Sequence, residues 1–161
     1  MIQRIQTVYL LLVVILSFVC LVSQIGYYTS NDETVASFSN FAFSSFGAYS
    51  AYSSVGPYAL GVLLIIVILL SLLSIMLFRK RMRQLRLVII SNILLFGYIA
   101  TYILFAYFYN ENLQLVQPSA PLSFHIRFAT LFPVLCFILN GLAIHGIRKD
   151  EALVRSLDRL R

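Results

Sequence analysis

Four apolar runs, each long enough to cross a lipid bilayer as a helix, constrain the fold of this chain more than any other feature. They occupy residues 7–27, 57–78, 87–108 and 124–145, and the only formally charged side chain within them is Arg127. A bilayer core about 30 Å thick requires roughly 20 apolar residues in a helix that rises about 1.5 Å per residue. The sequence therefore predicts an all-α membrane protein, a single domain of residues 1–161 whose four transmembrane helices form an antiparallel bundle.

The composition supports this class. Hydrophobic residues make up 60% of the chain and charged residues only 11%, whereas about 25% of the residues in a typical soluble domain are charged. A large soluble domain is therefore excluded. The net charge of +6 comes from basic residues that flank the apolar runs, so we expect membrane lipid, and not nucleic acid, as their partner.

The distribution of charge predicts the orientation, because basic residues concentrate on the cytoplasmic side of membrane proteins. Four spans place both termini on one side. If that side is cytoplasmic, it holds 11 of the 12 basic residues against three acids, Asp150, Glu151 and Asp158, for a net charge of +8. The opposite side holds one basic residue against three acids, Asp32, Glu33 and Glu111, for a net charge of −2. The N- and C-termini are thus expected in the cytoplasm.

Two polar segments lie outside the predicted spans. Residues 28–56 form a small extracytoplasmic loop rich in Ser, Phe and Tyr, whose aromatic spacing fits neither a strand nor a helix cleanly. Three alternatives remain for this loop: a short hairpin that caps the bundle, an interfacial helix that caps it, and a surface that binds a partner or lipid. The pattern of residues 146–161 predicts a short amphipathic helix on the cytoplasmic side, because one face of that helix carries an apolar stripe of Leu153, Val154, Leu157 and Leu160.

The basic turn between the second and third spans and this C-terminal helix emerge on the same side. We expect them to form one surface for anionic lipid or for a membrane-protein partner. Its residues are Arg79, Lys80, Arg81, Arg83, Arg86, Arg148, Lys149, Leu153, Leu157 and Leu160.

Polar residues inside the spans predict contacts between helices. Asn92, Asn140, Ser71 and Ser74 lie four to seven residues from the cytoplasmic ends of their spans, so they share a depth. Amides that face lipid are costly, and interhelical hydrogen bonds are therefore expected, with Asn92 and Asn140 as a candidate pair across the third and fourth spans. On the opposite side, Arg127 is expected to reach the membrane surface and pair with Glu111, with Asp32 and Glu33 as alternatives.

No motif predicts catalysis, a metal site or a cofactor. Cys20 and Cys136 fall in different spans at different depths, and His125 and His145 lie at opposite membrane faces. No pair of cysteines has redox spacing, and no glycine-rich loop precedes a basic residue. We therefore expect a protein that is not an enzyme.

The two ends of the chain carry a resemblance. Residues 1–11 (MIQRIQTVYLL) and 144–161 (IHGIRKDEALVRSLDRLR) resemble those of a bacterial family of small four-span membrane proteins known only as a domain of unknown function. The resemblance implies an integral protein of the bacterial inner membrane and supplies no activity. Because both motifs lie on the predicted cytoplasmic face, we expect Gln3, Arg4 or Gln6 to contact the tail around Asp150, Glu151 and Asp158. An accessory or assembly component is the expected function, with a small oligomeric transporter or pore as the alternative.

Overall fold

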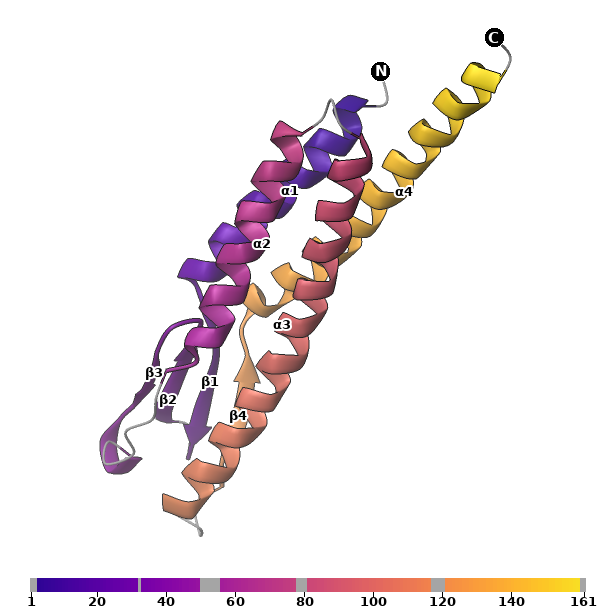
Figure 1. The fold of residues 1–161 in the computed structure, drawn as a ribbon. Helices are drawn as coiled ribbons and strands as arrows, with labels where there is room; N and C mark the ends of the chain where they lie inside the picture. The colour runs from indigo at the N-terminus through magenta and orange to yellow at the C-terminus, as the bar shows by residue number, and fades with distance from the viewer. Residues whose placement is uncertain (1–2, 32, 50–55, 78–80, 117–120, 160–161) are drawn as a thin grey trace.

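Four long helices and a small β-sheet make up the protein in the computed structural model, which describes residues 3–31, 33–49, 56–77, 81–116 and 121–159 (Figure 1). The helices are α1 (Gln3–Val22), α2 (Tyr58–Met76), α3 (Arg81–Val116) and α4 (Leu131–Arg159). Each contains a segment long and apolar enough to cross a membrane. The expectation of a mostly helical chain with four such helices is therefore confirmed within the described residues.

The helices pack side by side, and consecutive helices run in opposite directions (Figure 1). Between them lie two small apolar clusters, one around Leu10 and Val88 and the other around Val13 and Leu95. Large apolar side chains such as Phe96 also cover the outer surface. So much exposed apolar surface is typical of a protein in lipid, because water would penalise it.

A four-stranded antiparallel sheet lies at the end of the helices away from the start of α1 and the end of α4 (Figure 1). Its strands are β1 (Gln24–Ser30), β2 (Glu33–Ser39), β3 (Phe43–Ser45) and β4 (Ser123–Ile126), in the order β3-β2-β1-β4. Asn31, between β1 and β2, has a positive φ of 52°, which asparagine tolerates better than most residues. We call this end of the molecule the sheet end.

The largest core lies between this sheet and the second half of α3. The Phe38 ring stacks on Tyr102 with the ring centroids 5.7 Å apart, and the Phe43 ring stacks on Tyr109 at 4.2 Å. The Tyr28 hydroxyl donates a hydrogen bond of 2.6 Å to the carbonyl oxygen of Ala106. The sheet is thus fixed to α3 by aromatic packing and by a bond to its backbone.

The predicted bounds of the first and last spans were wrong. The first was expected to reach Tyr27 and the last to begin at Phe124, yet α1 ends at Val22 and α4 begins at Leu131. Residues 24–27 belong to β1 and residues 124–126 belong to β4, and the two strands pair with Tyr28 opposite Phe124. Both segments are uncharged, and the absence of charge does not distinguish a helix from a strand that is paired with another part of the chain.

The third span also differs, because α3 extends the predicted segment 87–108 at both ends. Its 36 residues measure about 54 Å at 1.5 Å per residue, well beyond the roughly 30 Å of a bilayer core. Its first turns include Arg83 and Arg86, so the predicted basic turn is largely helical. The loop 28–56 contains strands and the 3₁₀ helix η1 (Gly47–Tyr49), which favours the hairpin over the interfacial helix. The predicted C-terminal helix is the continuation of α4 as far as Arg159.

Candidate functional site

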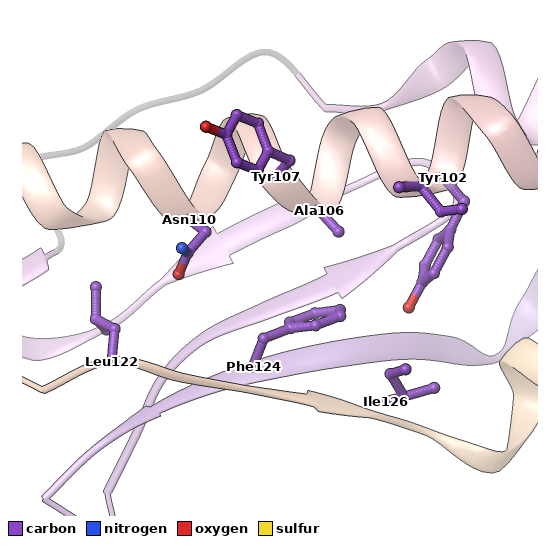
Figure 2. Close-up of a pocket in the computed structure, with 8 residues that line it drawn as sticks. Tyr102, Ala106, Tyr107, Asn110, Leu122, Phe124 and Ile126 are labelled. Atoms are coloured by element: carbon purple, nitrogen blue, oxygen red, sulfur yellow. The ribbon is translucent and has the colours of Figure 1, made fainter.

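A groove of about 420 Å³ opens between α3 and β4 (Figure 2). We call it the α3–β4 groove. Its lining residues come from two elements, and most of them are apolar or aromatic: Tyr102, Ile103, Ala106, Tyr107 and Asn110 from the α3 side, and Leu122, Phe124 and Ile126 from the β4 side. This volume lies within the range of about 300–1,000 Å³ that is typical of small-molecule pockets.

The periodicities of the two elements produce the groove. On α3, Tyr102, Ala106 and Asn110 are spaced four residues apart, so they lie on one face of the helix. Leu122 immediately precedes β4, and with Phe124 and Ile126 it alternates with Ser123 and His125. Alternate residues of an extended chain share a face. Figure 2 shows both faces directed toward the space between the elements.

Asn40 joins the sheet to the helices. Its side chain is fully buried and donates a hydrogen bond of 2.7 Å from Nδ2 to the carbonyl oxygen of Cys20 near the end of α1. Its Oδ1 accepts a bond of 2.8 Å from the Tyr98 hydroxyl on α3, and its carbonyl oxygen accepts one from the Gly61 N–H on α2. One residue thus pairs with polar groups of three helices and fixes the position of the sheet at their end.

The predicted polar layer is only partly assembled. Asn140 donates from Nδ2 to the Ser91 hydroxyl at 3.2 Å, so its partner on α3 is the neighbour of Asn92. Among the described residues, no hydrogen-bond partner is present for four buried atoms: Asn140 Oδ1, Asn92 Oδ1, Ser71 Oγ and Ser74 Oγ. The structure therefore brings α3 and α4 together through Ser91, which the sequence did not single out.

Arg127 and Glu111 have separate partners. The Arg127 guanidinium lies over the Tyr27 ring, 5.2 Å from its centroid, and Glu111 accepts a hydrogen bond from Tyr107 on its own helix. The predicted ion pair between them does not occur among the contacts of the described residues. Arg127 also lies before α4, between β4 and the 3₁₀ helix η2 (Phe128–Thr130), so it is not inside the fourth helix.

At the other end of the molecule, the start of α1 contacts α4 as expected. The Gln6 side chain donates a hydrogen bond of 2.7 Å from Nε2 to the Asp150 carboxylate, and both residues are buried, with 5% and 7% of their surfaces exposed. A Cβ atom added to Gly146 would lie 3.1 Å from Gln6 Cγ. The glycine therefore lets the two helices approach closely at the point where they share this bond.

Among the side chains that the structure describes, four exposed basic residues lie at the same end of the molecule, which we call the basic end: Arg83 and Arg86 on α3, and Arg148 and Lys149 on α4. Arg79 and Lys80 lie outside the described residues. The backbone of Arg81, Leu153 and Leu157 is helical, but their side chains and the whole of Leu160 are likewise outside the description. The structure thus describes four of the ten residues of the predicted surface in full.

Sequence reasoning missed the α3–β4 groove and Asn40. A signal for β4 was present, because apolar and polar residues alternate from Leu122 to Ile126, a pattern typical of a half-buried strand. Because this segment adjoins a long apolar run, residues 124–126 were assigned to the fourth span instead. Asn40 carried no comparable signal, because its partners Cys20 and Tyr98 are distant in the sequence.

In the part of the chain that the structure describes, no three His, Cys, Asp or Glu side chains gather as a metal site would require. Cys20 and Cys136 are free thiols, buried in the helical region. His125 stacks on Tyr27 and its Nε2 lies 3.0 Å from the Thr29 hydroxyl, so it is held by the sheet.

The model of the family described as "Domain of unknown function (DUF4293)" matches residues 2–160, nearly the whole chain. No curated protein matches this sequence.

Proposed function

Because the chain belongs to the DUF4293 family, whose description assigns no activity, we propose a function from its charge and geometry. The protein is a multi-pass component of a bacterial cytoplasmic membrane, with its N- and C-termini in the cytoplasm. It is not an enzyme and acts as an accessory or assembly component, whose basic end docks a partner protein that carries acidic groups. The sheet end then faces away from the cytoplasm.

The observation that supports this proposal best is the arrangement of charge. Exposed basic residues of α3 and α4 lie at the same end of two helices that pack against each other, where α3 begins and α4 ends (Figure 1). Each basic side chain near an anionic membrane surface contributes about 1 kcal/mol of attraction. The stretch of α4 that continues to Arg159 adds a helix with an apolar stripe in its sequence, and such a helix can pack into a partner's groove.

The bond between Gln6 and Asp150 supports the same proposal, because it fixes α4 to α1 just before this stretch. A helix that is held at its base presents its remaining turns in a defined direction. Binding then costs less conformational entropy than it would for a free tail.

Orientation is tested with a reporter enzyme that is active only outside the cytoplasm. Fusions after Asp32 or Asn112 are expected to be active, and fusions after Arg83 or Arg161 inactive. Activity of the fusion after Arg83 would contradict the four-span orientation, because this residue precedes most of α3.

Docking is tested by photocrosslinking in cells, with the crosslinker placed at Arg148 or, as a control, at Phe46 on the sheet end. A specific adduct is expected only from Arg148. Changing Leu153, Leu157 and Leu160 to Gln keeps every charge and should remove the adduct while the reporter fusions keep their pattern. If the same adduct persists in this variant, the apolar stripe does not dock a partner.

A second candidate, a small oligomeric transporter or pore, has one observation in its favour. Within the part of the chain that the structure describes, the buried atoms Ser71 Oγ, Ser74 Oγ and Asn140 Oδ1 have no hydrogen-bond partner. Unpaired polar groups in an apolar interior are expected to attract water or an ion. The two candidates are separated by measuring solute flux into vesicles that contain the purified protein. The flux is compared with that into vesicles that contain a Ser71→Ala/Ser74→Ala variant.

A further inference from the structure

We infer that the α3–β4 groove binds one acyl chain of a bilayer phospholipid. This inference goes beyond the docking role and rests only on the membrane placement of the helices. It assigns a ligand to a part of the molecule for which the sequence indicated none.

The position of the groove supports a lipid. Tyr102, Ile103, Ala106 and Tyr107 belong to the last turns of the uncharged run 87–108, and Asn110 lies just beyond that run. The groove therefore begins where α3 leaves the apolar layer. Tyrosine residues are enriched at this boundary in membrane proteins because each has an apolar ring and a polar tip.

The groove is also continuous with the surface of α3 that faces outward. Phe96 and Ile103 are seven residues apart, about two turns, and both are more than 60% exposed. An acyl chain that lies along this side of the helix can enter the groove without crossing a polar barrier. Within the groove, Ile126 and Tyr107 are 64% and 63% exposed, so both walls offer apolar surface to an occupant.

The arrangement of polar groups predicts the direction of the lipid. Asn110 and Leu122 lie at one end of the groove, and Tyr102 and Ile126 lie at the other (Figure 2). The Tyr102 hydroxyl is directed to the carbonyl oxygen of Ile25 at 3.3 Å, so this residue presents its ring to the groove. The ester and headgroup are therefore expected near Asn110, with the acyl chain running past Ala106 toward the membrane interior.

The protein contains no tryptophan, so a single introduced tryptophan is a unique fluorescent reporter. The full-length chain is reconstituted in phosphatidylcholine vesicles whose lipids carry bromine at several depths along one acyl chain, since bromine quenches tryptophan on contact. Three reporters are compared: Ile126→Trp in the groove, Phe96→Trp on the outward face of α3, and Phe128→Trp, which lies outside the groove at the same end of the molecule.

We expect quenching of Ile126→Trp comparable to that of Phe96→Trp. Adding Ala106→Phe, which fills the groove from α3, should remove most of the quenching at position 126 and leave that at positions 96 and 128 unchanged. Leu122→Phe fills the groove from the opposite wall and should act in the same way, which guards against a folding defect peculiar to one variant.

Two results would overturn the inference. If Ile126→Trp is not quenched while Phe96→Trp is, the groove excludes lipid, as it would if a protein segment or a second copy occupied it. If Ile126→Trp is quenched equally with and without both filling substitutions, the residue only touches the bilayer surface. Absence of quenching at Phe96→Trp would instead contradict the membrane placement itself.

Discussion

Replacing Asn40 with alanine removes the side chain that joins the sheet to α1 and α3. The amide donates to the carbonyl oxygen of Cys20 at 2.7 Å and accepts from the Tyr98 hydroxyl at 2.8 Å. Losing the bond to Cys20 costs about 0.5–1.5 kcal/mol net, and leaving a buried hydroxyl such as that of Tyr98 unpaired costs about 1–3 kcal/mol. Because Tyr98 is buried, the expected loss for Asn40→Ala is about 2–4 kcal/mol.

The thiol of Cys20 offers a local assay of this loss. Its sulfur lies 3.8 Å from the Tyr98 hydroxyl oxygen and the residue is fully buried, so a thiol reagent reacts only when the junction opens. In a Cys136→Ser background, 2–4 kcal/mol corresponds to a reaction that is roughly 30- to 700-fold faster, since each 1.4 kcal/mol is a factor of ten. The rate is measured in lipid vesicles at equal reagent concentration.

Two further variants show whether the bonds themselves are responsible. Tyr98→Phe removes one of the two bonds and should cost about 1–2 kcal/mol. The double variant Asn40→Ala/Tyr98→Phe should cost less than the sum of the single changes, because each single change strands the other side chain. A Cys20 reaction rate within twofold of the parent in Asn40→Ala, or strictly additive costs, would refute this account of the junction.

Two other predictions follow from single hydrogen bonds between helices. Because Asn140 bonds to Ser91, the losses of stability from Asn140→Leu and Ser91→Ala should be non-additive in unfolding experiments. The losses from Asn140→Leu and Asn92→Leu should be additive. Coupling between the two asparagines would instead support their predicted pairing. Gln6→Glu places a second carboxylate against Asp150, so we expect a loss of about 1.5–3 kcal/mol, measured by thermal unfolding in detergent. The double variant Gln6→Glu/Asp150→Asn should recover part of the lost stability. If it recovers none, the two side chains do not contact each other.

Individual residues show which contacts the sequence pattern can predict and which it cannot. The contact of Gln6 with the tail was expected because both ends of the chain were placed at one membrane face, and the bond to Asp150 confirms it. The pairing of Asn92 with Asn140 was an inference from depth alone. Depth does not fix the rotation of a helix, and a rotation of one residue, about 100°, brings Ser91 toward α4 in place of Asn92.

The amino-acid sequence by itself determined the number of membrane-length helices and the concentration of basic residues at one end, because both depend on composition summed over many residues. Only the tertiary structure decided that residues 24–30 and 123–126 pair as strands, and that Asn40 and Tyr98 meet. Strand pairing and hydrogen bonds join residues that are far apart in the chain, so no local window of the sequence contains them. The α3–β4 groove follows from the same cause, since one wall is a strand that exists only through its partner β1.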